Sequence, residues 1–111
     1  FESPEHGAVV AFLGLVRGSE GGSPILSITY EAYQGMAQRE LGRIVSEARS
    51  LWPVEVAVSH RTGRVAVSEP SLIVASRGAH RREAFEACEF VVGQIKARAA
   101  IWKVEYEWAA A

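Results

Sequence analysis

The sequence predicts an α+β protein with two helices and mostly antiparallel strands. Two long segments carry apolar residues at helical spacing, and six shorter segments are alternating or continuously apolar, which is typical of strands. Their order along the chain, ββαβββαβ, favours an antiparallel arrangement. Neither an internal repeat nor a domain boundary is visible, so residues 1–111 are expected to form one domain.

The N-terminal part is predicted to contain two strands separated by a loop. Residues 8–16 are almost continuously apolar, so this strand is expected to be buried on both faces. Residues 18–24 are rich in glycine and serine and predict a mobile loop. Residues 25–33 form the second strand, and we expect the two strands to pair as a hairpin. Three side chains of the second strand are expected to share one face: Leu26, Ile28 and Tyr30.

Two helices are predicted, at residues 36–52 and 80–99. The first ends at Pro53, and its apolar stripe consists of Leu41, Ile44, Val45, Ala48, Leu51 and Trp52. The stripe of the second consists of Ala84, Phe85, Cys88, Val91, Val92, Ile95 and Ala99. Because it lies on this stripe, Cys88 is expected to be a core residue rather than a nucleophile. The other strands are expected at residues 54–61, 64–67, 72–76 and 101–108.

The composition argues against several classes of protein. A formal net charge of −1 argues against binding to nucleic acid or membranes through the overall field. No apolar run approaches the ~18 residues that span a bilayer, and no signal peptide is visible. A single cysteine cannot form an internal disulfide and fits a reducing compartment, so a cytoplasmic location is expected.

Lysine is scarce in this chain. Ten of the 12 basic residues are arginines, and the two lysines are Lys96 and Lys103. A lysine ammonium can lose its proton in a suitable environment, whereas a guanidinium stays charged. Lys96 falls in the last turn of the second helix and Lys103 early in the final strand, so a tight turn would bring together two cations suited to acid–base chemistry. The alternative is a cation at a helix C-terminus and an exposed strand lysine paired with Glu105.

A second basic cluster surrounds the start of the second helix. His80, Arg81 and Arg82 crowd a helix N-terminus, where a cation is disfavoured by about 0.3–1 kcal/mol. A bound anion such as phosphate would relieve this conflict. The alternative is that these side chains extend into water while Glu83 complements the helix dipole. Arg17, between the first strand and the glycine-rich segment, either binds a ligand or only ends the strand.

The two basic clusters cannot reach one small substrate within one chain. His80 and Lys96 are sixteen positions apart on the same predicted helix, which is about 24 Å at ~1.5 Å per residue. A shared site must combine His80 and Arg81 of one chain with the lysines of another, which predicts a homodimer with two equivalent sites. His60 is interpreted as a structural histidine. No spacing of His, Cys, Asp or Glu suggests a metal.

Several stretches of this sequence resemble the large, catalytic subunit of molybdopterin synthase, the MoaE family. They are residues 7–17, 30–33 with 35–37, 60–63, 79–88 and 96–105, which occur in the family's order and cover nearly the whole chain. The most specific pieces are His-Arg-x-x-Ala-Phe, beginning at His80, and Ile-Trp-Lys, beginning at Ile101.

The resemblance implies an α/β hammerhead-type fold and a sulfurtransferase of molybdenum cofactor biosynthesis. In the family, a homodimer binds small ubiquitin-like sulfur-carrier subunits to form a heterotetramer. The carrier's C-terminal Gly-Gly thiocarboxylate enters the active site. Its sulfur is transferred twice to cyclic pyranopterin monophosphate (precursor Z), which gives molybdopterin. The resemblance implies neither a cofactor nor a metal for this step.

The resemblance also implies which residues act. The family's substrate-binding positions correspond to Leu15, Val16, Arg17, His80, Arg81, Lys96, Lys103, Val104 and Glu105. As hypotheses, Arg17, His80 and Arg81 hold the substrate's phosphate and orient the pterin. Lys96 is the essential acid–base group or activates the carbon that receives sulfur, and Lys103 supports it by stabilising negative charge.

The chain departs from the family's pattern in four places. Ala100 stands where proline usually precedes Ile-Trp-Lys and is expected to loosen the turn between the lysines. Val104 stands where a second basic residue is common. Residues 68–70 replace the usual Gly-Asp-type turn, and the ending at residues 109–111 is expected to shorten a segment that helps the carrier to dock. These departures affect the expected affinity for the partner but remove no proposed catalytic residue.

Two other functions compete with sulfur transfer. One is a non-catalytic dimeric scaffold that holds a pterin or the carrier protein, which would make both lysines superfluous. The other is an unrelated anion-binding enzyme of the α+β class, such as a phosphate-ester lyase. It would act on its substrate without any thiocarboxylated partner.

Overall fold

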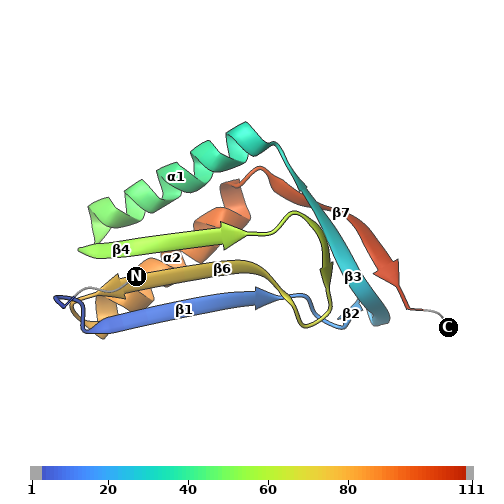
Figure 1. Cartoon of the computed structure of the whole chain (residues 1–111), viewed down its shortest axis with the longest axis horizontal. Coiled ribbons are helices and arrows are strands. Elements are labelled where there is room, and N and C mark those ends of the chain that lie inside the picture. The colour runs from blue at the N-terminus through green and yellow to red at the C-terminus, as the bar shows by residue number, and fades with distance from the viewer. Residues whose placement is uncertain (1–3, 110–111) are drawn as a thin grey trace.

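The computed structural model describes residues 4–109 and confirms the α+β class (Figure 1). The helices of the described part are α1 (Gln34–Leu51) and α2 (Arg81–Arg98). Its strands are β1 (Ala8–Leu15), β2 (Ser19–Glu20), β3 (Ser23–Ala32), β4 (Val54–His60), β5 (Gly63–Ala66), β6 (Pro70–Gly78) and β7 (Ile101–Trp108). The two-residue β2 is the element that the sequence pattern missed. No helix between residues 4 and 109 is long and apolar enough to cross a membrane.

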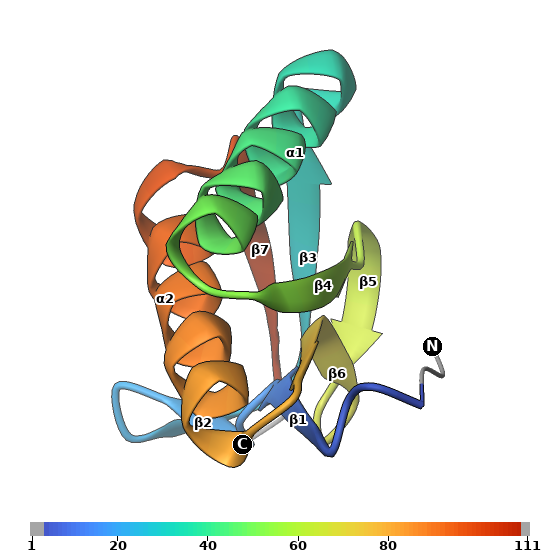
Figure 2. The same ribbon diagram turned by 90° about the vertical axis from the view of Figure 1, so that its left-hand side faces the viewer.

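One sheet consists of β1, β6 and β4, with β6 in the centre and antiparallel to both neighbours. The two helices cover one face of this sheet (Figures 1 and 2). The core between them and the sheet consists of Ile44, Ala48, Leu72, Val74, Cys88, Val91 and Ile95. Burial raises the pKa of the Cys88 thiol, and its Sγ lies 3.8 Å from the Val74 carbonyl oxygen. The prediction that Cys88 is a core residue is therefore confirmed.

The other face of this sheet is uncovered within the chain. Val9, Leu13 and Leu15 are 59%, 52% and 53% exposed, so the expected burial of the first strand on both faces is wrong. The helices cover a single face, whereas the apolar run supplies apolar side chains to both. Ile73 of β6 is paired with Leu13 and is also exposed. We call this surface, formed by Val9, Ala11, Leu13, Leu15 and Ile73, the open face.

The second sheet is built around β3, which pairs antiparallel with β2, β5 and β7. It has a smaller core made of Val16, Ile25, Ile28, Tyr30 and Val65. The register of β3 against β7 shifts between Ile25 and Ser27. Because this irregularity interrupts the alternation, Ser27 is buried and Leu26 is 50% exposed. The expectation that Leu26 shares a face with Ile28 and Tyr30 is therefore wrong.

The glycine-rich segment is a tight hairpin, so the predicted mobile loop is wrong. Glu20 of β2 pairs with Ser23 of β3 across Gly21 and Gly22, whose φ angles are +57° and +84°. Two positive φ angles in a two-residue turn match the twist of the flanking strands, and glycine adopts them without steric cost. The expected pairing of the first two long strands is also wrong. After β1 the chain enters the second core at Val16, and β1 pairs with β6 instead of β3.

The helical stripes are confirmed in their centres and wrong at two positions. Leu51 and Phe85 belong to the predicted stripes but are 60% and 61% exposed. Leu51 is the last residue of α1, and Phe85 lies to one side of the buried stripe of α2. On α2 the predicted Ala84 and the unpredicted Ala87 are both fully buried, and their small side chains allow close packing against neighbouring elements.

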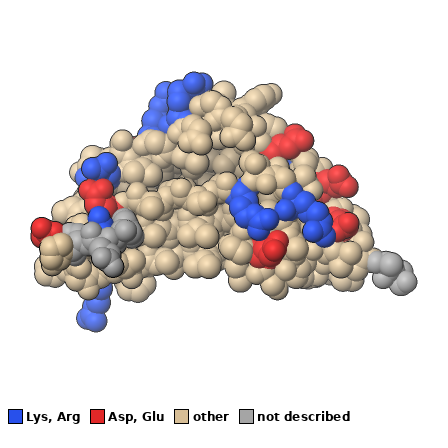
Figure 3. Space-filling model, in the orientation of Figure 1, with Lys and Arg blue, Asp and Glu red and all other residues tan. Residues whose placement is uncertain are grey.

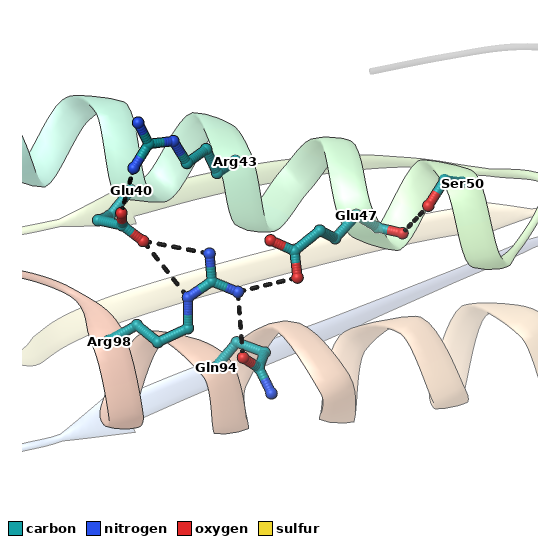
Figure 4. Close-up of polar contacts among 6 residues, drawn as sticks. All are labelled: Glu40, Arg43, Glu47, Ser50, Gln94 and Arg98. Carbon is teal, nitrogen blue, oxygen red and sulfur yellow. Dashed lines mark hydrogen bonds and ion pairs between the residues drawn. The ribbon is translucent and has the colours of Figure 1, made fainter.

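Arg98 ties the end of α2 to α1 (Figure 4). Its guanidinium donates to Glu40 Oε2 at 3.1 Å, to Glu47 Oε1 at 2.8 Å and to Gln94 Oε1 at 3.2 Å. Hydrogen bonds from Arg43 and Arg98 lower the pKa of Glu40, and the bond from Arg98 lowers the pKa of Glu47. These bonds hold the last turn of α2, from which the chain enters β7.

Candidate active site

A cavity of about 750 Å³ lies where the two sheets meet the end of α2. Its walls come from the second half of β1 and the two residues after it, the ends of β2 and β4, the middle of β3, the start of β6, the last turn of α2 and the start of β7. The chain thus gathers segments that are far apart in sequence, such as those of Phe12 and Trp102.

The cavity wall includes five of the predicted site residues: Leu15, Val16, Arg17, Lys96 and Lys103. Three of these carry positive charge and come from three different segments. Neither lysine forms an ion pair with a residue in the described range, so the alternative pairing of Lys103 with Glu105 is not observed. Both lysines line this one cavity, and a turn of two residues joins the elements that carry them. That their ammonium groups act as a pair stays a prediction.

Aromatic rings lie under both ammonium groups. The Lys96 Nζ is 5.9 Å from the centre of the Phe12 ring, and the Lys103 Nζ is 6.0 Å from that of Tyr106. A cation over an aromatic face is stabilised by the ring quadrupole without a counter-ion. The positive charge of both lysines therefore stays available to an anionic ligand.

The connection between the two lysine-bearing elements consists of Ala99 and Ala100. The Ala100 carbonyl accepts a hydrogen bond from the Tyr33 N–H at 3.2 Å. The Tyr33 ring also packs against Trp102, with 5.2 Å between ring centres. The entry into β7 is thus tied to Tyr33, the residue that follows β3. That Ala100 loosens this turn relative to proline stays a prediction.

His80 and Arg81 lie at the opposite end of α2 and do not line the cavity. His80 precedes the first residue of α2 and Lys96 lies in its last turn, so the sixteen positions between them correspond to about 24 Å at ~1.5 Å per residue. The two basic clusters are therefore far apart within one chain, in agreement with the sequence argument. Val104 and Glu105 are exposed on β7 and also lie outside the cavity wall.

Sequence reasoning missed six polar or aromatic side chains on the wall: Phe12, Glu20, Tyr30, His60, Ser71 and Trp102. The sequence pattern indicated a structural role for His60, and its Nδ1 does lie 2.8 Å from the Arg61 carbonyl oxygen. The sequence did offer a signal that His60 belongs to the site, because it lies at the end of a predicted strand and in residues 60–63, one of the stretches that resemble the family. Glu20 carried none, because its place depends on the hairpin that the sequence did not reveal.

This fold and this cavity define an α+β protein with a cationic site at the junction of two sheets and a helix end. A family model described as MoaE protein matches residues 1–98 of the chain. The chain belongs to the MoaE family.

Curated relatives of this chain are named molybdopterin synthase catalytic subunit. The protein of Homo sapiens is 43% identical over 104 residues, which cover 93% of this chain and 55% of the human protein. The protein of Thermoplasma volcanium is 39% identical over 101 residues, covering 90% of this chain and 74% of that protein. The chain therefore spans little more than half the length of the human relative.

Solved structures agree with the fold. Molybdopterin synthase from Staphylococcus aureus superposes with a TM-score of 0.92 at 32% identity, covering 99% of this chain and 80% of that chain. A protein–protein complex of subunits 1 and 2 of the molybdopterin-converting factor from Helicobacter pylori gives a TM-score of 0.78 at 25% identity. It covers 95% of this chain and 73% of that chain.

Proposed function

We propose that this chain acts as the large, catalytic subunit of a molybdopterin synthase. Its reaction is the transfer of sulfur to cyclic pyranopterin monophosphate, which yields molybdopterin. The observation that carries the proposal is the convergence of the two lysines and Arg17 on one cavity. A phosphorylated substrate and a thiocarboxylate are both anions, so a cavity with three cations suits both reactants. The similarity to curated catalytic subunits supports the same reaction.

Each cation has a separate task in this proposal. The guanidinium of Arg17 binds phosphate oxygens, because its planar fork donates to two of them at once. Lys96 supplies or removes a proton, or activates the carbon that receives sulfur. Lys103 stabilises the negative charge that develops as sulfur is transferred. Leu15 and Val16 form the adjoining wall, whereas Val104 and Glu105 lie outside the cavity and would contact only a ligand that extends along β7.

His80 and Arg81 of a second copy would complete the phosphate site. The open face offers the contact surface: it is apolar, and the middle of this side of the molecule carries no charged residue in Figure 3. In the β1–β6 pairing, Ala8 lies opposite Gly78 at one end and Leu15 opposite Pro70 at the other. A twofold axis that lies in the plane of this contact and perpendicular to β1 would place the His80 end of one copy beside the Arg17 end of the other.

The proposed partner is a small ubiquitin-like carrier with a C-terminal Gly-Gly thiocarboxylate. The Helicobacter pylori complex, whose fold this chain shares over 95% of its length, supports a two-subunit assembly. The carrier's tail would enter the cavity beside the β2–β3 hairpin, which contributes Glu20 to the wall. The prediction made for residues 109–111 falls mainly on residues 110 and 111, which lie outside the described range. A single cysteine, Cys88, fits a cytoplasmic setting for this assembly.

The decisive experiment mixes the purified chain with thiocarboxylated carrier and cyclic pyranopterin monophosphate and quantifies molybdopterin. Lys96→Ala is expected to lower the rate by about 10²–10⁴-fold while carrier binding persists, because a positioned acid–base group contributes this much. Lys96→Arg keeps the charge but cannot readily release a proton, so it separates proton transfer from electrostatic attraction. Arg49→Ala, an exposed change on α1, serves as the control and is expected to leave the rate unchanged.

The competing functions give different results in the same experiment. No product despite a demonstrated complex with the carrier would indicate a scaffold. Consumption of the pterin substrate without any thiocarboxylated carrier would indicate a lyase. Either result would overturn the proposed sulfur transfer.

A further inference from the structure

The positive charges of the cavity suit the anionic groups of the reactants, but they do not explain how the pterin ring would be recognised. Arg17, Lys96 and Lys103 are hydrogen-bond donors without acceptor capacity. A pterin, by contrast, carries ring N–H and amino groups that need acceptors when they leave water. Among the ionisable side chains that line the cavity, acceptor atoms are found on Glu20, Tyr30 and His60.

His60 is held firmly in the wall by two contacts. Its ring meets the ring of Tyr30 edge-on, with 5.3 Å between centres and 72° between planes. Tyr30 is itself only 9% exposed, so it offers a fixed support. The His60 Nδ1 lies 2.8 Å from the carbonyl oxygen of Arg61. Ring packing and hydrogen bond together leave the imidazole little freedom to turn.

The hydrogen bond also determines which ring nitrogen bears the proton. A carbonyl oxygen can only accept, so Nδ1 must be the donor. In the neutral ring Nε2 then carries a lone pair, and it has no hydrogen-bond partner within residues 4–109. Burial lowers the pKa of His60 and outweighs the opposing effect of the bond to Arg61, which favours the neutral ring near pH 7.

We propose that His60 is a specificity-determining residue, whose Nε2 accepts a hydrogen bond from a ring N–H or amino group of the bound pterin. The assignment rests on the proposed function and deepens it. Phosphate and thiocarboxylate are attracted by the cations, whereas the heterocycle is selected by a neutral acceptor at a fixed position. Discrimination by such a group is large, because an unmatched polar atom in a closed site loses its water without gaining a partner.

Glu20 suits this task less well than His60. Its carboxylate is charged, so it attracts the nearby cations and repels the phosphate of the substrate. It also sits on a two-residue strand next to Gly21 and Gly22, whereas His60 ends a seven-residue strand paired to β6. The more rigid of the two positions is the better one for selecting a ligand by geometry.

The test measures binding of 6-hydroxymethylpterin, a neutral fluorescent pterin, to the purified chain. His60→Phe keeps a ring against Tyr30 but removes both nitrogens, and it is expected to weaken binding about tenfold. His60→Gln returns an acceptor near the place of Nε2 and is expected to recover most of the affinity. Affinity for inorganic phosphate, which needs only the cations, is expected to stay within about twofold in both variants. Thermal unfolding verifies that each variant is folded.

In the sulfur-transfer assay, the same His60→Phe change is expected to raise KM for the pterin substrate about tenfold with little change in kcat, because its target is binding rather than chemistry. Pterin affinity in His60→Phe equal to that of the unaltered chain would overturn the assignment alone. So would a glutamine variant as weak as the phenylalanine variant. Phosphate binding by the unaltered chain without any pterin binding would overturn the proposed substrate as well, and the assignment with it.

Discussion

The helix-covered sheet and the β3-centred sheet differ in how they are stabilised. The first packs two helices on one face and encloses residues that are fully buried, among them Ile44, Val74 and Val91. The second has no helix of its own within the described residues, and its final strand β7 is exposed at most positions. Its core is smaller and includes the partly polar Tyr30.

This difference indicates how stability and chemistry are distributed. Lys96 comes from the helix-covered half, whereas Lys103, Tyr30 and the hairpin come from the other half. The cavity therefore depends on how the two halves meet, because both supply its wall. Changes in the core of the first half, away from the cavity, should affect stability more than activity, and changes near the cavity in the second half should do the reverse.

The largest expected effect comes from breaking the core of the helix-covered half. Ile44→Ala leaves a cavity at a site with 0% exposure and is expected to reduce the free energy of unfolding by about 2–5 kcal/mol. Below its unfolding temperature, the variant should transfer sulfur at a rate within about twofold of the unaltered chain. Urea denaturation and the molybdopterin assay measure the two quantities.

Leu51→Ala on the same helix is the matched control. Because Leu51 is 60% exposed, its truncation is expected to cost less than about 1 kcal/mol. Equal destabilisation by the two changes would show that the helix packs in another orientation than the one described.

These differences also explain what the sequence could and could not predict. The helix-covered half could be predicted from the spacing of its apolar residues. The helical spacing in α2 and the alternation in β4 directly identify the faces that are buried. The lysine pair was visible because lysine is scarce and the helix and final strand are adjacent in sequence. The pairing of the strands could not be predicted, because β1 and β3 have the same local sequence pattern whether β1 pairs with β3 or with β6. Leu26 was misplaced because the irregularity that changes its face arises in the pairing of β3 with β7, a strand that is distant in sequence.

A smaller effect is expected from a change in the backbone of the β3-centred half. Gly63 starts β5, pairs with Tyr30 and has a φ of +83°, with open space where a Cβ would lie. Gly63→Ala therefore costs only backbone strain, about 1–2 kcal/mol of unfolding free energy. Because Gly63 follows His60 by three residues, we expect pterin binding to weaken more than in Ile44→Ala, although the loss of stability is smaller.

Gly42→Ala provides the control for this glycine. It lies in the interior of α1 with nothing near its added methyl group, so alanine is expected to stabilise the chain by about 0.5–1 kcal/mol. Loss of stability in both glycine variants would mean that the positive φ of Gly63 is not the cause.

The smallest expected effect concerns the end of α2, from which the chain enters the second sheet, and it depends on pH. Arg98 holds the last turn of α2, and its hydrogen bonds contribute to the lowered pKa of Glu40 and Glu47. A carboxyl with a lowered pKa in the folded state stabilises the protein above its unfolded pKa, near 4.5, and loses that contribution as pH falls through the folded value. Arg98→Met should therefore unfold at a lower temperature than the unaltered chain at pH 7, with the difference shrinking below about pH 4.

Because Lys96 lies one helical half-turn before Arg98, the variant should also transfer sulfur more slowly at pH 7, whereas Arg43→Met, which loosens only Glu40 on α1, should not. A temperature difference that is constant from pH 7 to pH 3 would show that Arg98 acts through packing of its side chain rather than through these carboxylates.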